Sequence, residues 1–211
     1  MAEEDVHTIR GFTKDRAEAL TDGIFATVMT ILILSLVVPV ITSGNVDQML
    51  SADLISLVPN VVTYVMSFLV LGTIWIGHNN IFRYLERAES KVQWINMAFL
   101  LGVGFIPFTT ALLGRYPFDH IASLIYGINL LGVAIVYNFF FGYALMEKLL
   151  HREVQVKFFK TALKRSSVGI LVYLIGIIFS FVNPEISLGL YIIMPIYYMA
   201  LGTISGKEAI H

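Results

Sequence analysis

The chain has 211 residues, of which 57% are hydrophobic and only 14% carry a charge. A soluble globular domain has about 25% charged residues, so this composition indicates a protein that is dissolved in lipid. The formal net charge of −1 excludes an overall basic field for nucleic acid, and the absence of cysteine excludes disulfides and thiolate chemistry.

Six long stretches of the sequence contain no Asp, Glu, Lys or Arg, and a helix needs about 20 apolar residues to cross a hydrocarbon core. Their apolar residues are continuous and do not alternate, which argues against the strands of a membrane barrel. We therefore expect an all-α integral membrane protein, with one membrane domain over residues 1–211 and six transmembrane helices per subunit. The expected spans are about 16–40, 54–80, 92–113, 121–146, 166–182 and 186–204.

The basic residues orient this bundle. Of the 14 Lys and Arg residues, all except Arg115 flank the expected helices on one side. Cytoplasmic loops carry an excess of Lys and Arg, so the pattern predicts a multi-pass protein of the cell membrane with both termini cytoplasmic. The basic and apolar segment Glu147–Arg165 is predicted to lie against anionic headgroups as an interfacial helix or helix extension, with ligand sensing as the alternative.

The first expected span begins with an unusually polar group. Arg16 precedes Asp22 by nearly two helical turns, Thr21 is its neighbour, and two dozen uncharged residues follow. An unpaired carboxylate near the hydrocarbon is costly, so Asp22 is predicted to pair with His78, which ends the second span at the same depth. The alternative is that Asp22 only lies in the interface, where the helix dipole favours a negative charge. The predicted interhelical polar network is Arg16, Thr21, Asp22, Trp75, His78, Asn79 and Asn96, although Trp75 equally suits an aromatic belt.

A polar stripe continues along the same helix. Gly23, Thr27, Thr30 and Leu34 follow one another at i, i+4, i+7 and i+11, on one side of the helix. In spanning helices, threonine hydroxyls commonly bond to a carbonyl one turn earlier, and the spacing alone favours this role. If several copies of the helix surround an axis, the oxygens of Thr27 and Thr30 would instead replace part of a cation's hydration shell, and Ile31 with Leu34 would form a hydrophobic constriction.

Three pieces of the sequence together resemble the prokaryotic members of the transmembrane protein 175 family. The first is Arg-Ala-Glu-Ala-Leu-Thr-Asp-Gly-Ile-Phe-Ala at 16–26 with Met29 and Thr30, which is similar to the family's Arg-x-x-x-Phe-Ser-Asp signature. The others are Trp-Ile-Gly-His-Asn at 75–79 and Ile-Pro-Phe-Thr-Thr-Ala-Leu-Leu-Gly at 106–114. The resemblance implies a potassium-favouring cation channel that conducts passively as a homotetramer, with the first helix of each subunit lining a central pore.

The same resemblance implies roles for individual residues. Arg16, Thr21, Asp22 and His78 match the family's polar network, and Thr30 matches a threonine layer implicated in cation preference. Thr27, however, stands where the family usually has a large aliphatic constriction residue, so the seal is expected to move to Ile31 or Leu34. The implied pore-lining residues are Gly23, Thr27, Thr30, Ile31 and Leu34, with permeant potassium at Thr27 and Thr30.

The expected partners are potassium and other monovalent cations, membrane lipid and further copies of the chain, without nucleic acid and without a cofactor. The alternative function is a proton-coupled carrier or proton pathway that uses Asp22 and His78 as a relay. Broken helices or inverted repeats of the transporter type are not evident. An enzyme is not expected, because the spans offer no second carboxylate and His120 lies at the opposite side.

Overall fold

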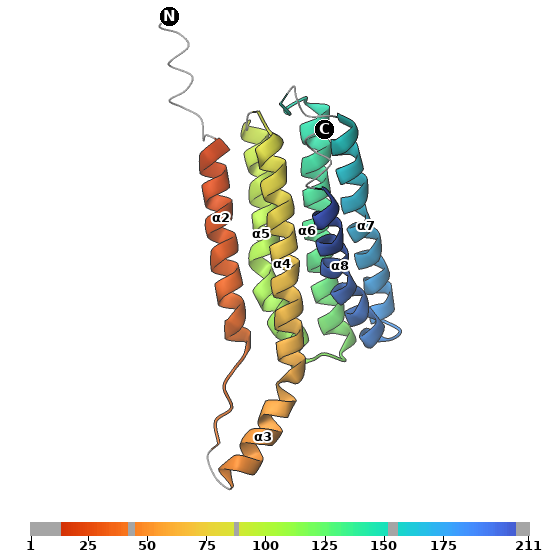
Figure 1. Ribbon diagram of the computed structural model, residues 1–211. Helices are drawn as coiled ribbons and strands as arrows, with labels where there is room; N and C mark the ends of the chain where they lie inside the picture. The colour runs from red at the N-terminus through yellow and green to blue at the C-terminus, as the bar shows by residue number, and fades with distance from the viewer. Residues whose placement is uncertain (1–13, 42–44, 87–88, 152–155, 206–211) are drawn as a thin grey trace, which may run out of the picture.

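The computed structural model describes residues 14–41, 45–86, 89–151 and 156–205, without the side chains of 156–158 and 201–205. These residues are almost entirely helical (Figure 1). The elements are α2 (Lys14–Ile31), the 3₁₀ turn η1 (Leu32–Ser35), α3 (Val46–Ser56), α4 (Val58–Tyr84), α5 (Ser90–Arg115), α6 (His120–Met146), α7 (Val156–Ser180) and α8 (Pro184–Ser205).

Six of these helices form one bundle and alternate in direction, whereas α3 projects from one end of it (Figure 1). Helix α2 lies at an edge and packs on α4 and α5, and α6, α7 and α8 make up the other side. The start of α2 and the end of α8 consequently lie at the same end of the bundle.

Five helices in the described part of the chain are long and apolar enough to cross a membrane: Lys14–Ser35, Val58–Tyr84, Ser90–Arg115, His120–Met146 and Phe159–Ser180. This confirms the predicted class, an all-helical membrane protein. Helix α8 has 22 residues but is not among these five, so the sixth span stays a prediction.

The helices differ from the expected spans at three places. The first span does not continue to residue 40, because the helix tightens into η1 and the chain is extended after Ser35. The second expected span is broken at Leu57, where Pro59 at the start of α4 has no N–H to continue the hydrogen-bond ladder of α3. The fifth helix starts at Val156, ahead of the expected span, so part of the basic segment Glu147–Arg165 forms the predicted helix extension.

The interior has two apolar clusters. One fills the middle of the bundle and includes Phe25 of α2, Leu32 of η1, and Phe99 and Val103 of α5. The other lies at the end where α2 begins and includes Ala17, Leu85 and Leu149. Both clusters bury one face of α2, so this helix is fixed along most of its length although it stands at the edge.

Small residues allow close packing of α6, α7 and α8 around Tyr191. Its fully buried ring lies where a Cβ on Gly127 or Gly176 would otherwise stand, and its hydroxyl donates a hydrogen bond of 3.3 Å to the carbonyl oxygen of Ser123. Small residues at helix contacts are typical of membrane bundles, in which van der Waals packing holds helices together.

The end of the bundle where α2 begins is tied together by backbone hydrogen bonds. Just after α6 and its C-cap Glu147, Lys148 lies in the left-handed region, at a φ of 53°, and the N–H of Leu149 bonds back to the carbonyl of Ala144. The same turn pairs with the end of α4, where Glu86 N donates to Leu149 O. Lys14 Nζ of α2 donates to Leu85 O at 2.8 Å, so α2 is attached to this junction as well.

Candidate ion pathway on helix α2

Helix α2 has two unlike faces. The buried face consists of Ala17, Thr21, Phe25 and Val28, and it continues into Leu32 of η1. The opposite face is exposed in the single chain and carries the predicted pore-lining residues Gly23, Thr27, Thr30, Ile31 and Leu34. The predicted stripe therefore lies on one surface and points away from the chain's own interior.

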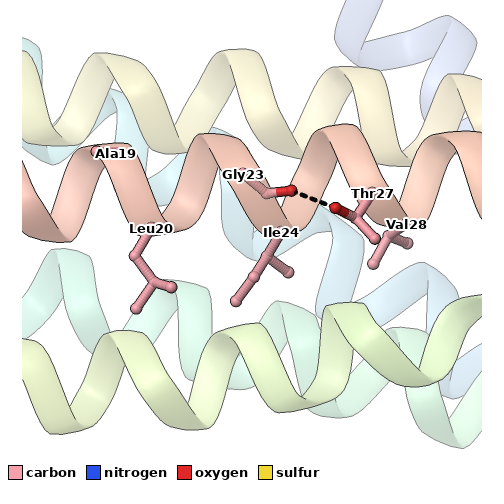
Figure 2. A pocket seen from close by; sticks show the side chains of 6 residues that line it. All are labelled: Ala19, Leu20, Gly23, Ile24, Thr27 and Val28. Carbon is pink, nitrogen blue, oxygen red and sulfur yellow. Dashed lines mark hydrogen bonds between the residues drawn. The ribbon is translucent and has the colours of Figure 1, made fainter.

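Both threonine hydroxyls on this surface bond to the backbone of their own helix. Thr27 Oγ1 donates to Gly23 O at 2.8 Å (Figure 2). Thr30 Oγ1 donates to Thr27 O, also at 2.8 Å. This confirms the backbone-bonded role that the spacing favoured. Each hydroxyl donates its one hydrogen in this bond, so the lone pairs of its oxygen can still accept. A surface of oxygen acceptors on an apolar helix is compatible with a passing cation.

A shallow groove of about 390 Å³ runs beside this surface and is lined by Ala19, Leu20, Gly23, Ile24, Thr27 and Val28 (Figure 2). Leu20 and Ile24 form its wall on the side of α5, and both pack against the central cluster. A Cβ on Gly23 would meet nothing within 4 Å, so the surface of α2 is open at this turn.

The buried part of the polar network is a chain of three side chains. His78 Nε2 lies 2.8 Å from Asn96 Oδ1, and Asn96 Nδ2 donates to Thr21 Oγ1 at 3.0 Å. Thr21 Oγ1 in turn donates to Ala17 O. Because the Asn96 amide uses its nitrogen for Thr21, its oxygen accepts and His78 Nε2 is the donor. The chain joins α4, α5 and α2 and ends at a backbone carbonyl.

Asp22 belongs to a separate contact. Its Oδ1 accepts a hydrogen bond of 2.8 Å from Nε1 of Trp75 on α4, at the exposed edge of α2. The expected direct pair of Asp22 with His78 is not formed. Consecutive residues of a helix point about 100° apart, so Thr21 faces the interior and Asp22 faces outward, while His78 is buried on the inner side.

The remaining members of the predicted network lie around these contacts. Arg16 is exposed in the first turns of α2, and Asn79 is half-buried beside His78. The His78 ring stacks between two fully buried phenylalanines, with ring centroids 4.7 Å from Phe82 and 4.9 Å from Phe99. These rings hold the imidazole beside Asn96. The network therefore joins helices, and phenylalanine rings cover its His78 end.

A second polar cluster, which was not predicted from the sequence, lies in the half of the bundle nearer α3. Thr110 Oγ1 of α5 donates to Ser67 Oγ of α4 at 2.8 Å, and Ser67 Oγ lies 2.9 Å from the hydroxyl of Tyr126 on α6. All three side chains are buried. Two adjacent threonines inside an otherwise apolar span, at Thr109 and Thr110, were the available signal for this contact between helices.

Among the described residues, no three His, Asp or Glu side chains come together to hold a metal ion. Oxygen atoms for a cation are offered instead by the exposed hydroxyls and by the carboxylate of Asp22 on α2. A bundle of membrane-crossing helices with such a surface on an edge helix defines the class as a membrane protein with a candidate ion pathway.

Comparison with known proteins agrees with this class. The sequence profile of the TMEM175 family, described as endosomal/lysosomal potassium channel TMEM175, matches residues 16–107. The chain is 31% identical over 191 residues to the potassium channel Cha6605_3372 of Chamaesiphon minutus, covering 87% of this chain and 92% of that protein. It is 28% identical to the potassium channel HX13_20290 of a Chryseobacterium species, covering 89% and 93% of the two chains. The chain belongs to the TMEM175 family, as the resemblance implied.

Solved structures and animal relatives extend the comparison. The crystal structure of a lysosomal potassium-selective channel TMEM175 homolog from Chamaesiphon minutus matches with a TM-score of 0.79 at 28% identity, over 89% of this chain and 96% of that one. The potassium channel MtTMEM175 shares the fold, with a TM-score of 0.64 at 17% identity. The endosomal/lysosomal proton channel TMEM175 of Gallus gallus is 26% identical over 195 residues, which cover 87% of this chain but only 38% of that protein. The family and its solved members are ion channels and not enzymes.

Proposed function

We propose that this protein is a potassium-favouring cation channel, in which the α2 helices of four copies surround a central pore and conduct ions passively. The observation that carries the proposal is the pair of unlike faces on α2. One face is buried against α4 and α5, and the other presents two hydroxyl oxygens without cover from its own chain. Such a surface suits a water-filled axis better than lipid, because polar residues that face lipid are rare.

The proposed path has an oxygen-rich part and an apolar part. Rings of Thr27 and Thr30 hydroxyls would replace part of the hydration shell of potassium, with Gly23 leaving the path wide on the side of Asp22. Ile31 and Leu34, which are 45% and 71% exposed, would form the hydrophobic constriction beyond them. An aliphatic residue at position 27 would place the constriction at that turn. With threonine at this position, the narrow apolar section lies one or two helical turns nearer to α3.

Potassium is proposed as the preferred ion because the bacterial relatives that cover the whole length of the chain are named potassium channels. Basic residues support the proposed orientation in the cell membrane, with both chain ends cytoplasmic. Lys14, Arg83, Lys91 and Lys148 all lie at the end of the bundle where α2 begins, and Arg115 lies at the other end.

A proton pathway is the second candidate, because the animal relatives are named proton channels. A relay from Asp22 to His78 has no support, since the two side chains bond to different partners. The chain from His78 stops at the carbonyl of Ala17, and buried Val70 and Leu71 lie on α4 between it and the hydroxyl of Ser67. Protons would therefore pass along the exposed face of α2 and not through the subunit.

Reconstituted liposomes separate these functions. Vesicles that hold potassium are diluted into a sodium medium, and internal pH is followed with and without a protonophore. Potassium that leaves through the channel makes the vesicle interior negative, and this potential draws protons inward. A channel that passes potassium but not protons therefore acidifies the vesicles only when the protonophore is present. A protein that passes both ions acidifies them without the protonophore. No potassium flux in either condition would contradict the proposed function.

A further inference from the structure

Two described pieces of the chain between α2 and α4 lie outside the bundle and carry many exposed apolar residues. They are the extended residues 36–41 and helix α3, which is tilted away from the bundle at the end opposite the start of α2 (Figure 1). Val38 is 79% exposed, Val40 is 84% exposed, and no residue of α3 is buried. An exposed apolar surface of this extent marks an interaction site.

Charged residues show that this segment lies beyond the hydrocarbon. Arg115 and Asp119 are exposed at the adjoining ends of α5 and α6, and Glu185 is exposed at the start of α8. A Cβ on Gly114 would lie 3.2 Å from the Cα of Asn60, so the end of α5 is level with the first turn of α4. Helix α3 ends before that turn and carries Asp47 and Asp53 itself. Lipid chains therefore do not cover it.

The distribution of side chains around α3 also argues against a helix that lies flat on the membrane surface. Val46 and Ile55 are nine residues apart, so at 3.6 residues per turn they lie on opposite sides of the helix. Both are more than half exposed, and Leu54 adds a third direction. An interfacial helix has its apolar residues on one side. On α3 the apolar residues are divided between opposite sides, with Asp47, Ser51 and Asp53 among them, so no single face suits the lipid surface.

We infer that residues 36–41 and α3 pack against the same segment of neighbouring copies of this chain and form an apolar collar around the outer mouth of the pore. The inference rests on the proposed tetramer with α2 at its axis. Leu34 is the last member of the exposed stripe, and the extended residues follow it after Ser35. If four α2 helices surround one axis, residues 36–41 of the four copies would begin at the same level and lie next to each other.

The absence of cysteine from the chain makes a labelling test direct. Nitroxide labels are placed at Val38→Cys or Ile55→Cys in protein reconstituted into vesicles, with Leu171→Cys as the control. Leu171 is 61% exposed on α7, on the side of the bundle away from α2. Accessibility is measured with oxygen, which concentrates in lipid, and with a nickel chelate, which stays in water.

The collar predicts low accessibility of Val38→Cys and Ile55→Cys to both reagents. It also predicts dipolar broadening that disappears when labelled chains are assembled with an excess of unlabelled ones. High accessibility to the nickel chelate would show a free segment, and high accessibility to oxygen, as at Leu171→Cys, would show a segment in the membrane. Either result would overturn the inference.

Two further measurements keep the test interpretable. Ser51→Cys is a nearly isosteric change on exposed α3, and oxidation should give covalent dimers without any label; a purely monomeric product would count against the collar. Potassium flux is recorded from the same vesicles. Flux with water-exposed labels would refute the collar but not the channel, and protected labels without flux would refute the channel but not the collar.

Discussion

Trp75 donates a hydrogen bond of 2.8 Å from its indole nitrogen to Oδ1 of Asp22, and this bond fastens the exposed edge of α2 to α4. The preceding residue, Thr21, accepts a hydrogen bond from Asn96 of α5. Two consecutive residues of α2 thus bind two different helices, so the rotation of α2 about its own axis is fixed from both sides. The direction in which Thr27 and Thr30 face follows from that rotation.

Trp75→Phe keeps the ring but removes the donor to Asp22. Hydrogen bonds to charged groups contribute about 1.5–3 kcal/mol, so this variant should melt at a lower temperature in detergent. Asp22→Ala should have a similar effect, because it removes the same bond. Trp94→Phe is the matched control, since Trp94 is 76% exposed. Melting of Trp75→Phe and Asp22→Ala at the wild-type temperature would show that the bond contributes nothing to the fold.

Asn96→Ala removes the link between His78 and Thr21 and leaves two buried polar groups without this partner. Each such group costs about 1–3 kcal/mol, so the loss of stability should exceed that of Trp75→Phe. Thermal denaturation followed by size-exclusion chromatography measures it. Asn80→Ala, an exposed asparagine near the end of the same bundle, should change little. Equal behaviour of the two variants would contradict a structural role for the network.

Lys148→Gly should stabilise the protein. Lys148 follows the C-cap of α6 with a φ of 53°, a conformation that costs an L-residue about 1–2 kcal/mol and that glycine adopts readily. Lys148→Ala removes the same side chain but keeps the Cβ, so it should not raise the melting temperature. If both variants melt alike, the effect comes from the charge and not from the backbone.

Gly127→Ala should destabilise the contact between α6 and α8. The added methyl group would overlap the buried Tyr191 hydroxyl, and overpacking a filled interior typically costs about 1–3 kcal/mol. Gly189→Ala on α8 meets nothing within 4 Å and should be neutral or slightly stabilising. Thermal stability of both variants in detergent is the measurement, and a neutral Gly127→Ala would mean that Tyr191 moves freely.

Thr30→Ala tests the proposed cation preference. Removing one ring of hydroxyl oxygens should bring the potassium-to-sodium permeability ratio nearer to one, as measured by reversal potentials in bilayers. Thr73→Ala is the control, because Thr73 also bonds to a carbonyl of its own helix but lies on α4. An unchanged ratio in Thr30→Ala would remove this residue from the selective part of the path.

Thr27→Leu tests the width of the path at the position of the missing aliphatic residue. A larger apolar side chain should narrow and dry the pore, so the current should fall, whereas Thr27→Ala should leave the current unchanged or raise it. Single-channel or macroscopic current in bilayers is the readout. An undiminished current in Thr27→Leu would place Thr27 outside the conducting path.

Charge-free stretches of sequence were sufficient to predict the bundle helices, because lipid tolerates few charges. The break at Leu57 was not predicted, although Pro59 was visible, because a single proline in a long apolar run permits either a kink or a new helix. The early end of α2 left no clear signal: Leu36, Val37 and Val38 suit a helix in lipid as well as an extended segment.

The candidate site was predicted in part. The exposed stripe with Thr27 and Thr30 was predicted because helical periodicity determines which residues lie on the same side of a helix. The partners of Asp22 and His78 did not follow, because they depend on how α2 and α4 are rotated against α5. That rotation depends on contacts between the helices, such as the packing of Phe25 on Phe99, which sequence periodicity alone does not determine.

The even number of bundle helices, which brings the start of α2 and the end of α8 to one end, has a practical consequence. Two copies of the chain can be joined head to tail by a short polar linker that does not have to cross the bilayer. In the proposed tetramer, two such concatemers would allow two or four altered subunits to be built in at known positions. If Thr30 lines the path as proposed, ion selectivity can then be measured as a function of the number of Thr30 hydroxyls.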